Sequence, residues 1–185
     1  MPRASDKRER LIRSADHLIL RQGFKQTTLS DIARDSGVPL GNVYYYFKTK
    51  DDIGHTVVRS RVAAMQALLD RYAIHEDPKR QLIEFLRFPL QIRDDLARNG
   101  CPLGTLAYEL SRPDSQFRED SRELLQVVLD WSTTRFEAID PDQGADLALQ
   151  FVATLQGMSL VANALDDPQV VERLVERLRA WIESL

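Results

Sequence analysis

The chain has 185 residues, of which 43% are hydrophobic and 29% are charged, a composition typical of a folded globular protein and not of a disordered or membrane-embedded one. No apolar run approaches the roughly 18 residues of a membrane span, and the first residues lack the apolar stretch of a signal peptide, so we expect a cytoplasmic protein without a membrane partner. Cys101 is the only cysteine, which excludes an intrachain disulfide.

The net charge of −3 is unevenly distributed along the chain. Residues 1–50 hold ten Lys and Arg against five Asp and Glu, a formal charge of +5, which leaves −8 for the rest. A basic head attracts phosphate and an acidic body repels it, an arrangement that orients a molecule on a polyanion. Chance surface charge is the alternative explanation.

Helical periodicity predicts an all-α fold with about nine helices, and no run of alternating β-branched residues indicates a strand. Capping signals stand at the pairs Thr28/Asp31 and Thr49/Asp52 and at Asp77, Asp114, Asp140 and Asp167. The predicted helices, with boundary errors of roughly two to four residues, span 5–22, 29–36, 40–46, 50–74, 78–98, 102–111, 115–138, 141–164 and 168–184. Pro89 lies inside the fifth helix, which should kink or break near Phe88.

Two short predicted helices meet at Gly37. In a helix-turn-helix the turn needs a residue that accepts a positive φ, and a residue where the two helices cross must have a small side chain. Gly37 suits the first role and Ala33 the second. The residues expected on the inward faces are Ile32, Val38, Val43 and either Tyr46 or Phe47, covered by Leu11, Ala15, Leu18 and Ile19 of the first helix.

The outward face of the third helix suits the major groove of duplex DNA. Gly41 permits close approach, Asn42 can contact a base or a phosphate, and tyrosines and lysines can reach phosphates. The N–H groups at Thr28, where the second helix starts, offer a phosphate clamp. Core packing is the alternative for each tyrosine. The candidate DNA-binding residues are Thr28, Leu40, Gly41, Asn42, Tyr44, Tyr45, Lys48 and Lys50.

The same stretch contains Gly23-Phe24, Thr27-Thr28, Ile32-Ala33, Gly37-Val38, Gly41, Tyr44-Tyr45-Tyr46-Phe47 and Lys50. With these motifs, residues 8–54 resemble the head of the TetR family of bacterial repressors. The resemblance implies a DNA-binding domain at 1–50, joined by a long fourth helix to a ligand-binding and dimerisation domain at 51–185. Pro39-Leu40 departs from the small polar residues common in the family, although Leu40 can still meet a thymine methyl.

The last two predicted helices carry more apolar residues than one core-facing stripe needs, so a second buried face is expected. The resemblance implies that these helices form a homodimer, which places two heads in successive major grooves of a palindromic double-stranded operator. A wholly intramolecular core is the alternative. The expected interface residues are Phe151, Leu155, Met158, Val171, Leu174, Leu178 and Trp181.

The resemblance also implies a small-molecule inducer site in the body, beneath the fourth helix. The ligand is expected to favour a body conformation in which the fourth helix tilts and the two heads separate beyond groove spacing. Core packing is the alternative for every candidate. The candidate pocket residues are Phe85, Phe88, Cys101, Leu103, Tyr108, Phe117, Leu124, Trp131, Phe151 and Leu155.

Cys101 lies in a segment, Asn99-Gly-Cys-Pro-Leu-Gly-Thr-Leu, that resembles one in a branch of these regulators, some of which sense electrophiles or oxidants through the thiol. Its position at a helix start favours a reactive thiolate. A buried, inert cysteine is the alternative.

Two other classes of protein find little support. An enzyme would need chemistry that the chain does not show: there is no Gly-rich phosphate loop, and His17, His55 and His75 have no metal-ligand spacing with Cys101. We therefore expect no catalytic residues, no metal and no cofactor. A helical adaptor that binds only protein would have no use for the basic head.

Overall fold

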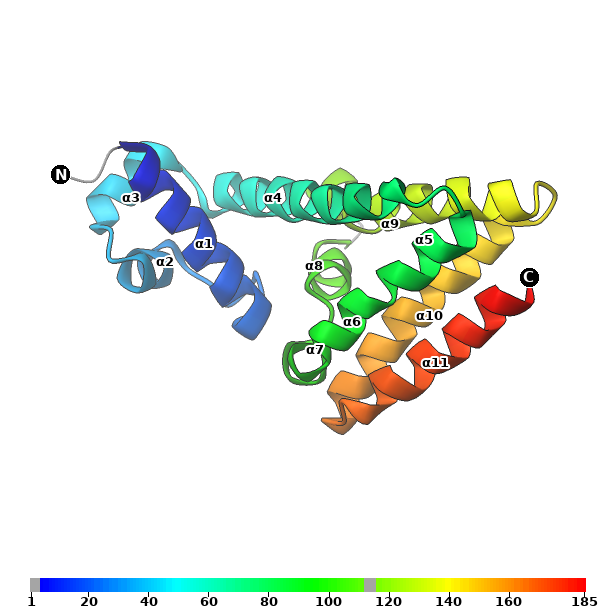
Figure 1. Cartoon of the computed structure of the whole chain (residues 1–185). Helices are drawn as coiled ribbons and strands as arrows, with labels where there is room; N and C mark the ends of the chain where they lie inside the picture. The colour runs from blue at the N-terminus through cyan, green and yellow to red at the C-terminus, as the bar shows by residue number, and fades with distance from the viewer. Residues whose placement is uncertain (1–3, 112–115) are drawn as a thin grey trace. The chain divides into compact units, whose positions relative to one another are not determined.

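The structure is a computed structural model that describes residues 4–111 and 116–185, and every regular element in these residues is helical (Figure 1). The elements are α1 (Ala4–Gln22), α2 (Leu29–Ser36), α3 (Leu40–Tyr46), α4 (Lys50–Asp70), the 3₁₀ turn η1 (Arg71–Ile74), α5 (Pro78–Phe85), α6 (Arg87–Gln91), α7 (Arg93–Asn99), α8 (Pro102–Leu110), α9 (Arg118–Ile139), α10 (Gly144–Leu165) and α11 (Gln169–Ser184). The all-α prediction is confirmed. The expected cap at Asp114 and the expected helix start at residue 115 lie outside the described residues.

The fifth predicted helix is interrupted twice. α5 ends at Phe85, and Ile92, with φ −109° and ψ 17°, separates α6 from α7. Pro89 explains the first break, because a proline ring clashes with the carbonyl four residues earlier, here that of Phe85. Counted as one interrupted helix, α5 to α7 bring the α-helices of the described residues to nine.

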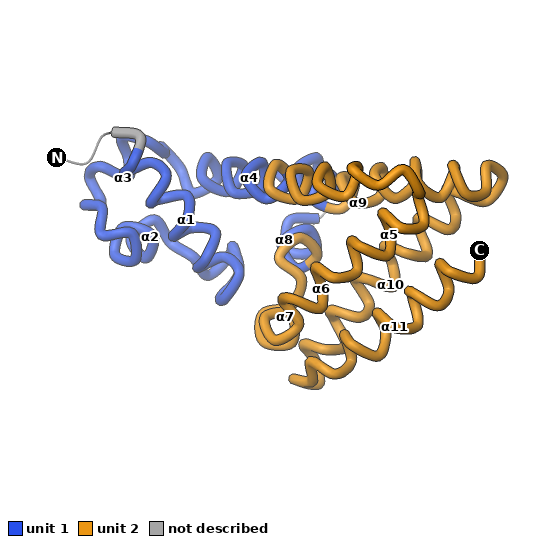
Figure 2. The backbone as a smooth tube through the Cα atoms, in the orientation of Figure 1, with its two compact units in different colours: residues 1–62, 105–124 blue, residues 63–104, 125–185 orange. Residues whose placement is uncertain are grey.

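The chain divides into two compact units (Figure 2). The first unit comprises residues 1–62 and 105–124, and the second comprises 63–104 and 125–185. The divisions between the units fall within α4, α8 and α9. Contacts in the first unit explain its extent: Phe117 packs edge-on against Phe24 with ring centroids 5.2 Å apart, and Arg61 donates to Asp16 at 2.6 Å.

A helix-turn-helix forms the core of the first unit. Leu11 and Ile32 are fully buried, together with Val43 of α3. Gly37 ends α2 in the left-handed conformation, with φ 64° and ψ 24°, and its N–H donates to the carbonyls of the last turn. The expected positive φ at this turn is confirmed.

In the second unit α10 and α11 lie side by side (Figure 1), around a cluster of aromatic side chains. The rings of Phe136 and Phe151 are fully buried, with centroids 5.7 Å apart. Phe85 of α5 lies 6.1 Å from Phe151, and Trp181 of α11 lies 5.5 Å from Phe136. Aromatic residues bury large areas, so this cluster joins α5, α9, α10 and α11 into one core.

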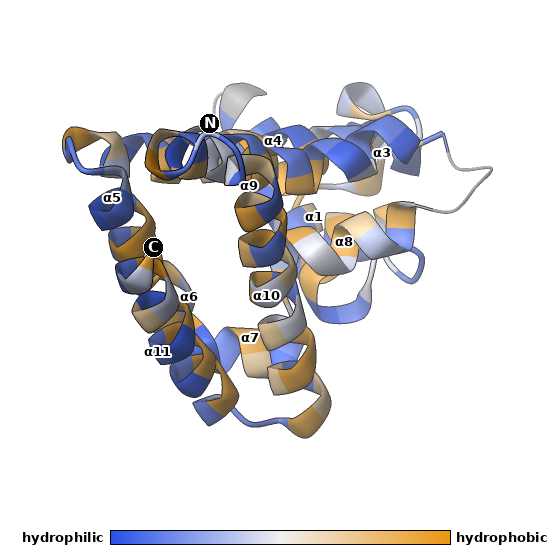
Figure 3. Cartoon of the chain, turned by 90° about the vertical axis from the view of Figure 1, so that its right-hand side faces the viewer, coloured by the Kyte–Doolittle hydropathy of each residue, from blue (hydrophilic) through white to orange (hydrophobic). Residues whose placement is uncertain are grey.

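α10 is apolar along its length, as Figure 3 shows. By length and composition its 22 residues meet the requirements of a membrane span, with a mean hydropathy of 1.3 in the most apolar window. The sequence prediction considered apolar runs alone and missed this helix. Of that window, 39% is buried inside the chain, and a core helix of a globular protein has the same composition. The remaining apolar surface of α10 still needs an explanation.

We predict that Gly37→Ala lowers the free energy of unfolding by about 1–2 kcal/mol, because a Cβ disfavours the left-handed conformation. The added Cβ would also stand 2.9 Å from the Arg10 guanidinium. Urea denaturation measures the effect. Gly41→Ala is the matched control: it has helical geometry and open space, and should stabilise by up to about 1 kcal/mol. Equal effects at the two glycines would contradict the assignment.

Candidate DNA-binding face and ligand cavity

α3 has one buried side and one exposed side. Val43 and Phe47 anchor it in the head, both nearly inaccessible to solvent. The side chains outside the core are Leu40, Tyr44, Tyr45 and Lys48, next to Gly41 and the half-buried Asn42. Tyr45 is 76% exposed. An exposed cluster of this kind is unusual for aromatic residues and indicates a binding surface.

The orientation of α3 is set from α1. Arg10 donates from Nε to the carbonyl of Ser36 at 3.1 Å, and its Nη2 contacts the same oxygen. The Ser36 hydroxyl in turn donates to the Ala33 carbonyl at 3.2 Å and accepts from the Val38 N–H at 3.3 Å. The end of α2 and the turn before α3 are therefore held by side chains as well as by the backbone.

Gly41 is not explained by packing within the head. A Cβ at this position would meet no described atom within 4 Å. Glycine inside a helix costs up to about 1 kcal/mol relative to alanine, so its presence on the exposed side suits close approach by an external surface.

Thr28 is engaged in a capping box. Its hydroxyl accepts from the Asp31 N–H at 3.1 Å, and the Asp31 carboxylate accepts from the Thr28 N–H at 3.1 Å and from the hydroxyl at 2.6 Å. The Thr28 hydroxyl, and then its N–H, hold the pKa of Asp31 below the ordinary value. The Asp31 carboxylate thus occupies the Thr28 N–H in this structure, and the phosphate clamp at Thr28 stays a prediction.

Lys50 also has a structural role. Its Nζ donates to the carbonyls of Phe24 and Lys25, both at 3.0 Å, and lies 4.6 Å from the centroid of the Phe24 ring. The role of Lys50 in DNA binding stays a prediction. Lys48 is exposed, and its Nζ donates to the Tyr44 carbonyl at 3.1 Å, so it remains on the outward side of α3.

Glu109 of α8 closes the end of α1. Its carboxylate accepts from the Phe24 N–H at 2.7 Å and from the Lys25 N–H at 2.6 Å. Gly54 of α4 leaves room for Phe24 and Phe117, since a Cβ there would stand 2.7 Å from the Phe24 ring. Sequence reasoning missed this junction, because no local pattern links Glu109 to residues so far away in the chain.

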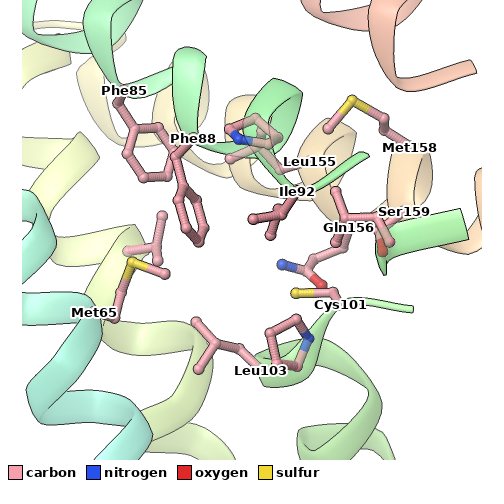
Figure 4. A pocket seen from close by; sticks show the side chains of 14 residues that line it. Met65, Phe85, Phe88, Ile92, Cys101, Leu103, Leu155, Gln156, Met158 and Ser159 are labelled. Atoms are coloured by element: carbon pink, nitrogen blue, oxygen red, sulfur yellow. The ribbon is translucent and has the colours of Figure 1, made fainter. Parts of the chain in front are cut away.

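A cavity lies within the second unit (Figure 4), with an empty volume of about 490 Å³, open solvent included. Of the candidate pocket residues, five line the cavity: Phe85, Phe88, Cys101, Leu103 and Leu155. Met65 of α4 and three residues of α10, Gln156, Met158 and Ser159, also line it and were missed. Ser159 is four residues after Leu155, so helical spacing could have found it.

The other candidate pocket residues lie elsewhere. Tyr108 is 85% exposed, and Phe117 packs against Phe24 in the first unit. Leu124, Trp131 and Phe151 are buried but are not part of the cavity lining. These five residues do not line this cavity, because aromatic and aliphatic periodicity does not separate core positions from cavity positions.

The expected interface residues are mostly core residues of the chain itself. Phe151, Leu155, Met158, Val171 and Leu178 are buried, and Leu174 and Trp181 are half-buried. The exposed apolar surface of α10 lies on another side of the helix. We call it the α10 stripe; it consists of Leu149, Ala153, Gly157, Leu160, Val161, Ala164 and Leu165. Its large members are 43–70% exposed.

Among the described residues, no group of three or more His, Cys, Asp and Glu is arranged to hold a metal ion. The first unit thus offers a glycine-jointed helix pair with an exposed, largely uncharged face, and the second offers an apolar cavity. The first arrangement defines a helix-turn-helix DNA-binding regulator. Residues 11–55 match the model for bacterial regulatory proteins of the tetR family. The head of the chain therefore carries a tetR-type DNA-binding domain.

Similarity to known proteins extends beyond the matched residues. A helix-turn-helix regulator of the lacX 3′ region from Lactococcus lactis subsp. lactis is 27% identical over 96% of this chain and 94% of its own. The Escherichia coli K12 repressor NemR is 29% identical over 65% of this chain and 60% of its own. Both of these relatives are transcriptional regulators by name.

Solved structures show the same fold. A tetR-family regulator from Agrobacterium tumefaciens superposes with a TM-score of 0.84 at 21% identity, over 95% of this chain and 97% of that one. The reduced form of E. coli NemR gives a TM-score of 0.79 at 19% identity, with the same coverage. At these identities the similarity supports the fold alone.

We predict that the Asp31 cap stabilises the head only above the pH at which the carboxyl is protonated. Because the folded state lowers the pKa of Asp31, the stabilisation is present above the ordinary aspartate pKa of about 3.9 and is lost as the pH falls through the folded value. The difference in unfolding free energy between wild type and Asp31→Asn should shrink from pH 7 to pH 3. Asp35→Asn, an exposed carboxyl of α2, is the control, and a matching pH dependence there would contradict the prediction.

Proposed function

We propose that the protein is a ligand-responsive transcriptional repressor, which binds a palindromic operator as a cytoplasmic homodimer and is released by a small-molecule inducer. The exposed side of α3 carries this proposal. Leu40, Tyr44 and Tyr45 remain outside the core, and Gly41 leaves the helix open to close approach. These groups suit major-groove contact: Asn42 for a base edge, the tyrosine hydroxyls and Lys48 for phosphates, and Leu40 for a thymine methyl.

The α10 stripe supports association of two copies. Leu160 is 70% exposed and Leu165 is 64% exposed, and large apolar side chains in a contiguous row mark interaction surfaces. Ala153 and Gly157 are interspersed among them, and small side chains allow two helices to approach closely. A second α10 is a self-complementary partner, as a twofold axis requires. Such a dimer presents two copies of α3, which a palindromic operator matches.

Communication between the cavity and the head is proposed to run along α8 and α4. Pro102 and Leu103, at the start of α8, line the cavity, and Glu109, near its end, binds the backbone N–H groups that follow α1. α4 likewise contributes Met65 to the cavity and begins in the head. A ligand that displaces the start of α8 or tilts α4 would therefore change the position of α3.

A thiol-reactive inducer is the second candidate. Cys101 lines the cavity, and its sulfur lies 3.4 Å from the Gly104 N–H that donates to it. Any molecule that enters the cavity can reach this sulfur. The inert alternative assigns Cys101 only to the start of α8, where its sulfur caps a free helix N–H.

We predict that Tyr45→Ala weakens binding to the DNA directly upstream of the protein's own gene by about tenfold or more, equivalent to about 1.4 kcal/mol. Fluorescence anisotropy across a salt series measures the affinity, which should fall steeply with salt for the wild type. Tyr108→Ala removes an even more exposed tyrosine, on α8, and should have no effect. Equal losses in the two variants, or none in Tyr45→Ala, would refute the assignment of the α3 face.

We predict that Leu160→Glu converts the dimer into a monomer, because it places a charge in an apolar interface without a partner. Sedimentation velocity gives the mass, and circular dichroism verifies that the variant is folded. Ile74→Glu makes the same change at a side chain of η1 that is 79% exposed, and should leave the mass unchanged. A wild-type protein that sediments as a monomer, or a dimeric Leu160→Glu, would exclude the α10 stripe as the interface.

A further inference from the structure

The cavity of the second unit has two chemically different ends. Phe85, Phe88 and Met65 gather at one end in Figure 4, while Gln156, Ser159 and Cys101 lie at the other. Among the described residues, no charged side chain lines the cavity; the polar ones that do are Cys101, Gln156 and Ser159. A charged ligand would therefore lose its hydration without gaining an ion pair.

Ser159 is a buried hydroxyl without a hydrogen-bond partner. It is 2% exposed, and its Oγ makes no hydrogen bond within the described residues. The other atom of this kind, Trp131 Nε1, belongs to a side chain outside the cavity lining. Leaving a buried polar group unpaired is unfavourable, and such a group in a native structure needs an explanation.

Several other hydroxyls on the helices of this chain donate to their own helix backbone. Ser132 donates to the Val128 carbonyl at 2.8 Å, Thr133 to the Leu129 carbonyl at 2.8 Å, and Thr154 to the Gln150 carbonyl at 2.8 Å. This bond to the preceding turn is the ordinary solution for a helical serine or threonine. Ser159 departs from it at the position where α10 lines the cavity.

We infer that Ser159, with the Gln156 amide beside it, binds the polar end of the ligand, and that the ligand is an uncharged, mostly apolar small molecule with one hydrogen-bonding oxygen at one end. The Ser159 hydroxyl supplies a donor to that oxygen, and the Gln156 side chain supplies a second donor. The rings of Phe85 and Phe88 receive the apolar end. This inference rests on the proposed function for its biological meaning, but the ligand chemistry is testable without DNA.

The chain provides its own reporters for the test. Its three methionines are Met1, Met65 and Met158, and the last two line the cavity. With ¹³C-labelled methionine methyl groups in the full-length protein, a ligand in the cavity should shift the Met65 and Met158 resonances and leave that of Met1 in place. Three probes of similar size are titrated: acetophenone, which has a carbonyl oxygen; cumene, which replaces that oxygen with a methyl group; and benzoate, which is charged. None of them reacts with thiols, so Cys101 stays unmodified.

Ser159→Ala should weaken acetophenone binding about three- to tenfold, the range expected for one hydrogen bond, and leave cumene binding unchanged or tighter. Benzoate should cause no shift at concentrations that saturate acetophenone. Ser132→Ala removes a buried hydroxyl that is bonded within α9, and should change neither affinity. Without ligand, Ser159→Ala should raise the melting temperature because it removes an unpaired polar group, whereas Ser132→Ala should lower it.

Several results would overturn the inference: an acetophenone affinity that is the same in wild type and Ser159→Ala, methyl shifts with benzoate as large as those with acetophenone, or no Met65 and Met158 shifts with either neutral probe. Failure of the proposed function has a different signature. In that case the methyl shifts would depend on Ser159 as expected, but acetophenone would leave the affinity for the operator unchanged. This result would support the ligand chemistry and contradict release by a ligand of this class.

Discussion

The left-handed turn at Gly37 is the constraint on which the exposed face of α3 depends. With φ at 64° it ends α2 and redirects the chain so that α3 begins only three residues later. Arg10 of α1 donates to the carbonyl of Ser36, the residue before Gly37, so α1 also stabilises this turn. Once the turn is set, Val43 and Phe47 bind α3 into the core, and geometry leaves Tyr44 and Tyr45 outside. The exposed face of α3 thus follows from the burial of Val43 and Phe47 and from the turn at Gly37.

The end of α1 is a second junction, and it explains why the first compact unit extends beyond the helix-turn-helix. Lys50 from α4 and Glu109 from α8 bind opposite kinds of backbone group in the segment at Phe24 and Lys25: the lysine takes carbonyls and the carboxylate takes N–H groups. Phe117 covers the Phe24 ring. A chain cut after residue 50 would lose Glu109 and Phe117, so the head as folded here includes residues from well beyond it.

Local signals predicted the elements well, and tertiary partners explain the errors. The bounds of α2 and α3 agree with prediction because the cap at Thr28 and the glycine at 37 act within a few residues of themselves. The role of Lys50 was not predictable, because a lysine at the start of a helix looks the same whether it meets phosphate or the carbonyl of Phe24. Tyr108 had the apolar spacing of a pocket residue, yet nothing in its own helix shows that this side faces solvent.

α10 shows the limit of sequence reasoning most clearly, because different residues of one helix serve three purposes. Phe151 packs in the aromatic core, Leu155 and Ser159 line the cavity, and Leu160 belongs to the exposed stripe. Successive residues of a helix are about 100° apart, so the step from Ser159 to Leu160 crosses from cavity to exposed surface. The hydropathy pattern predicts a mostly apolar helix that includes all of these positions. The packing of α7 and α11 against α10 determines which of the positions are buried and which are exposed. Since the cavity and the stripe share this rigid helix, a ligand that displaces α10 acts on the surface through which two copies are proposed to associate.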